Sequence, residues 1–145
     1  MSKICRECGA KCCKYFCFEI DEPDTFEEFE DIRWYLCHEG VTVHIDEGDW
    51  YMSIDNKCKM LADDNTCTIY ATHPLICSKY DPENCDHTGS DYGYDALLRT
   101  PEELEAYARK TLGPAAYKRA RAKALAKLKK RQEKKKRSRK NHRKK

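Results

Sequence analysis

The sequence has few of the residues that build a hydrophobic core. Leu, Ile, Val and Phe together number 22 among 145 residues, and a share this small is typical of chains that bury no core of their own. The scarcity excludes a large globular fold held by apolar packing alone. A folded domain of this chain therefore needs another source of stability, such as bound metal or disulfide bonds.

Long apolar runs are also missing. The first residues, Met-Ser-Lys-Ile-Cys-Arg-Glu-Cys, contain no stretch that resembles a signal sequence or a membrane span, so we expect a cytoplasmic protein without membrane contact. The six glycines form no G-x-G-x-x-G loop, and no serine, histidine and aspartate set or paired-carboxylate motif stands out. We therefore expect no catalytic residue and no catalytic activity in this chain alone.

What the chain does have is cysteine, ten in all. Chains with too little apolar surface to fold are poor in cysteine, so this content argues against a disordered protein. In a reducing cytosol, thiols at short spacings are more often metal ligands than disulfide partners. We therefore expect metal binding, and a disulfide framework is the alternative that an even cysteine count leaves open.

The first cysteine group has the spacing of a metal site. It reads C-x2-C-x3-C-C-x3-C over residues 5–17, and we expect this stretch to form a loop wrapped on metal. A C-x2-C unit lets two thiolates reach one ion through a tight turn, in zinc knuckles and in iron–sulfur loops alike. Cys12 and Cys13 are adjacent, and neighbours in an extended backbone point to opposite sides. This pair therefore favours two centres or one multi-iron cluster, or else one of the two thiols is simply buried.

The second group, over residues 58–85, matches no short metal signature by its spacing, but its motifs add a resemblance. The N-terminal C-x2-C-G-x2-C-C and the later C-x-x-L, C-x-I-Y and P-x-x-C-x-x-Y elements resemble the YkgJ-type cysteine-cluster family, also called the CxxCxxCC family. The likeness covers roughly residues 5–85. It implies a domain that chelates zinc or iron, and a relation to a domain of flagellin lysine N-methylases.

The resemblance also implies the metal ligands. The positions that match the family pattern are Cys5, Cys8, Cys12, Cys13, Cys58, Cys67, Cys77 and Cys85. Cys17 is a further candidate ligand. The chain departs from the pattern where Ala10 and Lys11 both precede the paired cysteines, and where His73 and Ser78 stand in place of arginines.

Other residues near the thiols have weaker claims. We expect Cys37, inside a predicted helix, to be a buried structural cysteine, and His73 and His87 are minor candidates for metal ligands. The aromatic residues that flank the cysteines are expected to form a dry shell around the site. They are Tyr15, Phe16, Phe18, Tyr70 and Tyr80.

Two arguments bear on which cofactor the thiols bind. Soft thiolates suit both zinc and iron–sulfur clusters. The adjacent cysteines and the relation to a methylase family favour an iron–sulfur cluster, with zinc as the alternative. The function expected is therefore metal chelation with a structural role, with redox activity or metal handling as extensions. The alternative is a component of a protein-modifying, lysine methylase-like enzyme that acts with a protein partner.

Local patterns predict an α+β fold. Thr25-Phe-Glu-Glu28 has the form of a capping box, and apolar residues at helical spacing then predict a helix over residues 25–39. The β-rich runs 41–45 and 50–54 predict a hairpin. Thr100-Pro-Glu-Glu predicts a helix to about residue 112, and a second helix begins at Pro114. The expectation is a small, irregular, metal-stabilised domain with short helices and a β-hairpin, followed by a basic helical tail.

Charge supports the same division of the chain. Residues 1–99 carry 9 Lys and Arg against 21 Asp and Glu, whereas residues 100–145 carry 19 against 4. We expect a cysteine-cluster metal-binding domain over residues 1–113 and a basic tail over 114–145, with order fading after Lys129. Such a tail is typical of segments that bind polyanions, so RNA or the ribosome is the expected partner. The alternative is a tail that only confers solubility or that docks on the acidic domain of its own chain.

Overall fold

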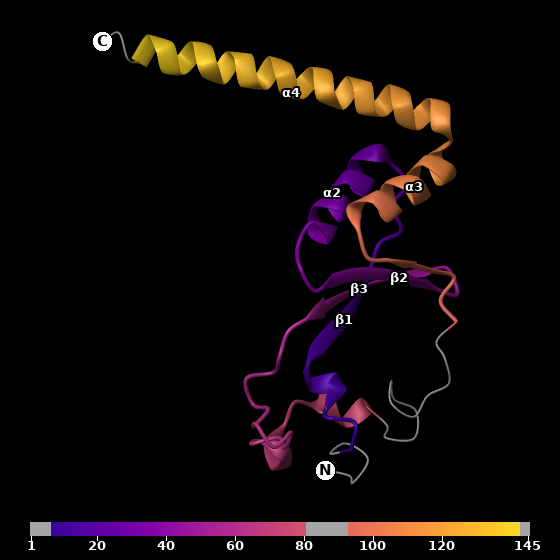
Figure 1. Ribbon diagram of the computed structural model, residues 1–145, viewed down its shortest axis with the longest axis vertical. Helices are drawn as coiled ribbons and strands as arrows, with labels where there is room; N and C mark the ends of the chain where they lie inside the picture. Colours follow the sequence, from indigo (N-terminus) through magenta and orange to yellow (C-terminus); the bar gives the residue numbers. More distant parts are fainter. Residues whose placement is uncertain (1–6, 81–92, 143–145) are drawn as a thin grey trace. The chain divides into compact units, whose positions relative to one another are not determined.

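The central element of the fold is a four-stranded antiparallel sheet (Figure 1). A computed structural model describes residues 7–80 and 93–142. The strands lie in the order β1, β3, β2, β4, so β1 and β4 are the edges. Their bounds are β1 Tyr15–Ile20, β2 Val41–Asp46, β3 Asp49–Asp55 and β4 Ala96–Leu98. This sheet, together with the helices, confirms the predicted α+β class.

The predicted hairpin is present as β2 and β3. Asp46 pairs with Asp49, so a loop of Glu47 and Gly48 joins the two strands. Both loop residues have positive φ, 51° and 90°, which is the backbone of a type I′ turn and the reason that glycine is favoured there. The Gly48 amide also donates to a carboxylate oxygen of Asp95 at 3.2 Å.

Alternation along the strands gives the sheet two different faces. Val43, Trp50 and Met52 are buried on one face. On the opposite face the His44 ring stacks on the Tyr51 ring, with 5.2 Å between centroids. The period-2 pattern of side chains along a strand produces this division, and it fixes the register of the sheet.

Strand β1 was not predicted from the sequence. The stretch up to Cys17 was expected to be a loop, yet residues Tyr15–Ile20 pair along their whole length with β3. Pairing with a strand more than thirty residues away overrides the weak local signal, because main-chain hydrogen bonds do not depend on side-chain pattern. The alternating run Tyr-Phe-Cys-Phe-Glu-Ile is the signal that could have revealed it.

Helix α2, Phe26–Leu36, begins with the predicted capping box. The Thr25 hydroxyl accepts from the Glu28 amide at 3.3 Å, and the Glu28 carboxylate accepts from the amides of Asp24 and Thr25 at 2.9 and 3.1 Å. These backbone donors lower the pKa of Glu28 below its ordinary value. The helix ends at Leu36, three residues earlier than predicted. Gly40 follows with φ of 72°, in a place where a Cβ would meet the Asp55 side chain at 2.9 Å.

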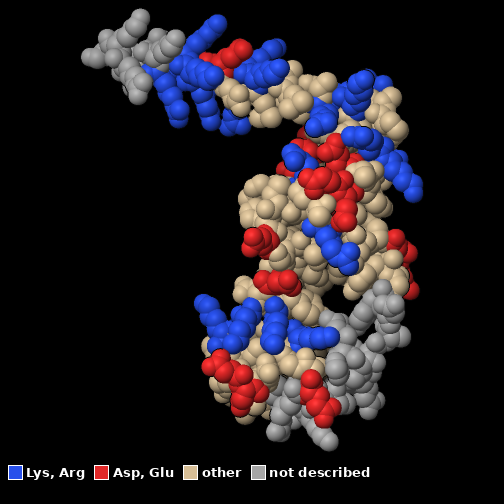
Figure 2. Space-filling model, viewed as in Figure 1, with Lys and Arg blue, Asp and Glu red and all other residues tan. Residues whose placement is uncertain are grey.

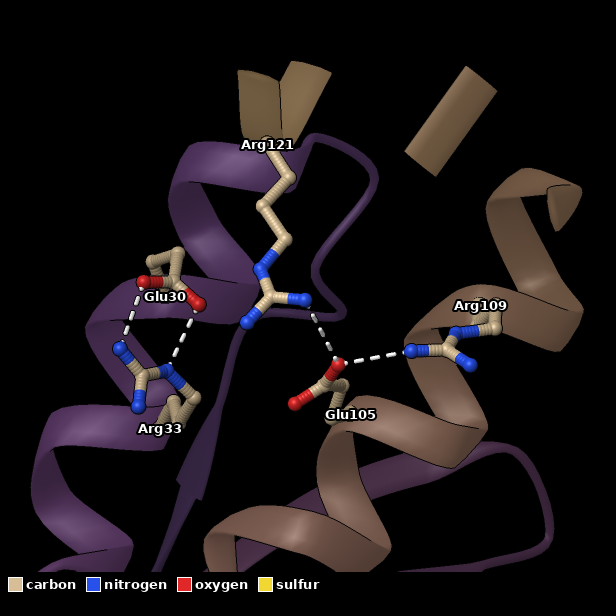
Figure 3. Close-up of polar contacts among 5 residues, drawn as sticks. All are labelled: Glu30, Arg33, Glu105, Arg109 and Arg121. Atoms are coloured by element: carbon tan, nitrogen blue, oxygen red, sulfur yellow. Dashed lines mark hydrogen bonds and ion pairs between the residues drawn. The ribbon is translucent and has the colours of Figure 1, made fainter. Parts of the chain in front are cut away.

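Helices α3, Pro101–Leu112, and α4, Pro114–His142, confirm the two helices predicted around Gly113. The Tyr117 ring packs edge-on against Phe26 at 5.2 Å, and the Arg109 guanidinium lies over it at 5.5 Å. Figure 3 shows Glu105 between two arginines: Arg109 donates to its carboxylate at 2.8 Å, and Arg121 lies 3.6 Å from the same oxygen. Burial and neighbouring carboxylates raise the pKa of Tyr117.

The basic tail is more ordered than expected. Order was expected to fade after Lys129, but α4 continues as helix to His142. Lysine, arginine, glutamine and glutamate all have high intrinsic helix propensity, which opposes the mutual repulsion of the charges. The correction matters because a helix fixes how these charges are arranged.

The chain forms two compact units. One comprises Met1–Glu22 and Tyr35–Thr100 and contains the sheet and the cysteines; the other comprises Pro23–Trp34 and Pro101–Lys145 and contains the helices α3 and α4. The domain boundary predicted after residue 113 stays a prediction. Within residues 7–80 and 93–142, no helix has both the length and the apolar character required to cross a bilayer.

Candidate metal centre

The loop before strand β1 makes a tight turn at Gly9 and Ala10. Both residues have positive φ, 68° and 54°, and Ala10 is buried. The left-handed region costs a residue with a Cβ roughly 1 to 2 kcal/mol, so tertiary contacts must hold Ala10 in place. The turn accommodates the extra residue before the paired cysteines and starts the short 3-10 helix η1, Lys11–Cys13, in which the Cys13 amide donates to the Ala10 carbonyl at 2.9 Å.

The 3-10 backbone changes the interpretation of the adjacent cysteines. Cys12 and Cys13 were expected to point to opposite sides of an extended chain. In η1 the backbone is helical instead, and an interaction with the Cys12 side chain lowers the pKa of Cys13, against the larger effect of burial. Two neighbouring thiols on this backbone do not have to point to opposite sides, so their adjacency alone no longer favours two centres or a multi-iron cluster.

The segment after strand β3 runs back against η1. The Cys58 amide donates to the Cys13 carbonyl at 2.7 Å, and the Asn56 amide donates to the Lys14 carbonyl at 2.8 Å. These two bonds continue main-chain pairing beyond the end of the sheet. They bring a cysteine of the second group directly beside the first group.

A small hairpin positions Cys67. Cys67 pairs with Leu61 as an antiparallel bridge. The Thr68 amide donates to the Met60 carbonyl at 2.9 Å, and Asp64 closes the turn by accepting from the Thr66 amide and hydroxyl at 3.0 and 2.6 Å. The turn residues between Cys58 and Cys67, which match no metal signature, thus serve to fold one cysteine back toward the other.

Cys77 lies in a second 3-10 segment, η3, Leu75–Lys79, which follows η2, Tyr70–Thr72. The His73 ring joins the two. Its Nδ1 donates to the Tyr70 carbonyl, and Nε2 accepts from the Ser78 hydroxyl at 3.0 Å. Both ring nitrogens are therefore engaged in hydrogen bonds within this segment, and the two residues that depart from the family's arginines are in contact with each other.

The environment of the Cys13 thiol shows which cysteines converge. Burial is the main cause that raises the pKa of this thiol, and its hydrogen bond with Cys12 opposes the rise. The negative charges of Cys58, Cys67 and Cys77 raise it further. Thiols from three separate segments thus lie within electrostatic range of one another. We call this group the Cys13 cluster: Cys12, Cys13, Cys58, Cys67 and Cys77.

This gathering of thiols agrees with a comparison of the sequence with protein families. The model of the family CxxCxxCC, described as "Putative zinc- or iron-chelating domain", matches residues 4–97. The chain belongs to the CxxCxxCC family. Neither a curated protein nor a solved structure matches it with significant similarity. Thiolate donors fit the zinc or iron of the family description, since both metals accept sulfur ligands.

Cys17 and Cys37 lie outside the segments that carry the Cys13 cluster. Cys17 sits on β1 opposite Ser53, where its charge contributes to raising the pKa of Tyr51, after burial and nearby carboxylates. Cys37 was expected to be buried inside a helix, but it is exposed because α2 ends one residue before it. Cys5, Cys85 and His87 lie outside the described residues.

The aromatic shell expected around the CxxCxxCC thiols is not formed. Phe16, Phe18, Tyr70 and Tyr80 are 45, 44, 51 and 43 % exposed, and Tyr15 is half-buried. Residues next to cysteines in short 3-10 turns and on an edge strand have too few neighbours to be covered. Cys58 and Cys77 are themselves exposed, and Cys8, Cys12, Cys13 and Cys67 are half-buried. The centre is therefore open to solvent.

The CxxCxxCC thiols converge without closing into a coordination shell. Within residues 7–80 and 93–139, no three side chains of Cys, His, Asp or Glu stand close enough to hold an ion as they are placed. Zinc–sulfur bonds are about 2.3 Å long. A metal held by the Cys13 cluster would therefore draw these thiols closer together.

Proposed function

We propose that this CxxCxxCC domain binds one zinc ion through the thiolates of Cys13, Cys58, Cys67 and Cys77. It is supported by the main-chain bond that joins Cys58 to Cys13 at 2.7 Å and by the electrostatic influence of Cys58, Cys67 and Cys77 on the Cys13 thiol. Three stretches of main chain, around η1, the 58–67 hairpin and η3, bring these residues together. Cys8 and Cys12, with Cys5 and Cys85, are the spare thiols of this proposal, and Cys17 is left out because it lies on the sheet.

Zinc is preferred over an iron–sulfur cluster for a structural reason. The adjacent cysteines favoured a cluster only as long as their backbone was taken as extended. In η1 the backbone is helical and the Cys12 side chain interacts with Cys13, so one of the two thiols can bind the ion while the other stays beside it. A single ion with four sulfur ligands in tetrahedral arrangement is the usual structural zinc site.

The bound ion would stabilise the fold. It would join three segments that carry only short 3-10 helices and one isolated β-bridge. Structural zinc contributes roughly 10 to 16 kcal/mol in small zinc domains, which is as large as the total stability of about 5 to 15 kcal/mol of ordinary domains. The shortage of aliphatic side chains is then no obstacle to folding.

Metal and sulfide analysis tests the proposal. The full chain, purified without oxygen, is expected to carry one zinc per molecule and no acid-labile sulfide. C58S is expected to lose the zinc, whereas the matched control C37S keeps it. Stoichiometric iron with sulfide would show that the domain binds an iron–sulfur cluster in place of zinc. A metal-free wild-type chain would overturn the proposal altogether.

We propose polyanion binding by helix α4 as a second function, with RNA as the ligand class. From Tyr117 onward the chain has 17 Lys and Arg and one acid, and Figure 2 shows the distal part of the helix covered in basic side chains. Within residues 7–80 and 93–139, Arg121 is the one basic residue of α4 that has an acidic partner. Unpaired charges at this density release counterions when they meet phosphates.

Retention on immobilised RNA tests the second function. The full chain is expected to bind with affinity that falls steeply between about 50 and 200 mM salt, by at least 10³-fold for six or more phosphate contacts. Deleting residues 129–145 should remove most of this binding while zinc content is unchanged. Unchanged retention after the deletion would contradict the proposal.

A further inference from the structure

The basic residues of the acidic half of the chain are not spread evenly. Six Lys and Arg and a single acid lie within two positions of the cysteines 8, 12, 13, 58, 67 and 77. The rest of residues 1–99 has three Lys and Arg against twenty acids. Basic residues therefore gather next to these thiols along a strongly acidic part of the chain, a contrast that the net charge conceals.

Five of these basic residues are lysines in the described part of the chain, and we call them the lysine rim: Lys11, Lys14, Lys57, Lys59 and Lys79. All five are exposed. Figure 2 shows a band of basic side chains across the lower half of the molecule, where this part of the chain lies. Consecutive Cα atoms are about 3.8 Å apart, so each rim lysine is no more than about 8 Å along the backbone from a cluster cysteine.

Two contacts place rim ammonium groups near the thiol segments. A Cβ on Gly9 would lie 3.7 Å from the Lys14 Nζ, so this ammonium sits over the turn that follows Cys8. Lys57 Nζ lies 3.6 Å from an Asp63 carboxylate oxygen across the 58–67 hairpin. Both side chains of the Lys57–Asp63 pair are exposed, so the pair is weak and leaves the Lys57 charge available to a ligand.

The centre also has features of a site that releases and accepts metal. Cys58 and Cys77 are exposed, and more thiols are present than one tetrahedral ion requires. A spare thiol such as Cys12 can enter while another leaves, which is how ligand exchange proceeds without a free ion.

We propose that the lysine rim makes this centre exchange zinc with small anionic complexes, in which carboxylate or phosphate oxygens hold the metal. The inference rests on the proposed zinc site. In the exchange each zinc–oxygen bond of the carrier is replaced by a zinc–sulfur bond. Every thiol that enters loses its proton to water, and the metal keeps its oxidation state. The rim raises the local concentration of the anionic carrier, as basic patches do for charged ligands.

Removal of zinc from the loaded full chain tests the inference with two chelators of different charge. EDTA is anionic and TPEN is neutral, and the release rate is followed with each under excess chelator. The rim variant K11Q/K14Q/K57Q/K59Q/K79Q is compared with K118Q/K123Q/K127Q/K129Q/K130Q, which removes the same charge from α4. In the rim variant we expect zinc release to EDTA to be about tenfold slower and zinc release to TPEN to be unchanged. The α4 variant should change neither release rate by more than about twofold.

The wild-type chain provides a second measurement that needs no substitution. Between about 20 and 200 mM salt the EDTA rate should fall severalfold, because exposed charges are screened within about 10 Å at 0.1 M, while the TPEN rate stays constant. If salt changed the release rates to EDTA and TPEN equally, or if the two sets of lysine substitutions had equal effects, the role of the lysine rim would be overturned while the zinc site would stand. A chain that binds no zinc would overturn both.

Discussion

The main-chain amide of Cys58 donates a hydrogen bond of 2.7 Å to the carbonyl oxygen of Cys13. This bond joins the two cysteine groups, which are separated in the sequence by strand β1, helix α2 and the β2–β3 hairpin. Because β1 pairs with β3, the residue before β1 and the residues after β3 emerge at the same end of the sheet. The sheet thus brings the two dispersed cysteine groups together at one of its ends.

Replacing Cys13 should cost both metal and stability. C13S removes the thiol whose pKa all other members of the Cys13 cluster influence, and we expect zinc content to fall at least tenfold. The free energy of unfolding should drop by more than about 3 kcal/mol, because metal binding is coupled to folding. The exposed Cys37 is the matched control, since C37S should change stability by less than about 0.5 kcal/mol. Denaturant unfolding with metal analysis measures both; equal losses in the two variants would refute a central role for Cys13.

The contact between His73 and Ser78 should position Cys77. The hydrogen bond from the Ser78 hydroxyl to His73 Nε2 closes the turn that carries Cys77, and a bond of this kind contributes about 1 kcal/mol. We expect S78A and H73N to speed zinc release severalfold, and the double variant to be no faster than either single one. H73N should release zinc more slowly than H73A, because the amide introduced by H73N can still donate to the Tyr70 carbonyl. Additive effects of H73N and S78A would show that the two residues act separately.

Acid should weaken helix α2 through Glu28. Its pKa is lowered in the folded chain by amide donors, so the carboxylate stabilises the fold above its unfolded pKa of about 4.5. That contribution is lost as the pH falls through the lower folded pKa. E28Q should flatten the stability profile below about pH 4.5, relative to the control E27Q on the same turn. A stability profile of E28Q that matched the wild type would contradict the capping role. T25A tests the same cap at neutral pH and should lower the free energy of unfolding by about 1 kcal/mol.

Tyr117 should be important for the helical unit. Its ring is buried against Phe26 and beneath Arg109, and truncating a buried aromatic ring costs about 3 to 5 kcal/mol. We expect Y117A to lower Tm strongly and Y117F to be nearly neutral. Since the folded pKa of Tyr117 is raised, its contribution is complete below about pH 10 and is lost as the pH rises through the folded pKa. Y117F should remove this alkaline dependence, and a Y117A variant as stable as the wild type would disprove the packing role.

Local signals in the sequence predicted much of this fold. The capping box at Thr25, the hairpin of residues 41–54 and the helix end near residue 112 each depend on a few neighbouring residues, and all three are found as predicted. Strand β1 was missed because its partner lies far away in the sequence. Helix α4 was underestimated because charge repulsion was given more weight than intrinsic helix propensity.

The candidate site was harder to predict than the fold. Cysteine spacing and family resemblance identified the thiols, but not which of them meet. That depends on the backbone at Ala10 and η1, and a left-handed alanine has no sequence signal of its own. Cys37 was misplaced because a one-turn error in the end of α2 moves a residue from a buried face to the surface.

Zinc K-edge X-ray absorption on the loaded full chain tests the central claim most directly, because it counts the atoms bound to the metal. The account predicts four sulfur atoms at about 2.3 Å with no second metal nearby, and a loss of one sulfur or of the whole signal in C13S. A shell dominated by nitrogen or oxygen, or a short metal–metal distance, would contradict a single zinc ion held by the Cys13 cluster.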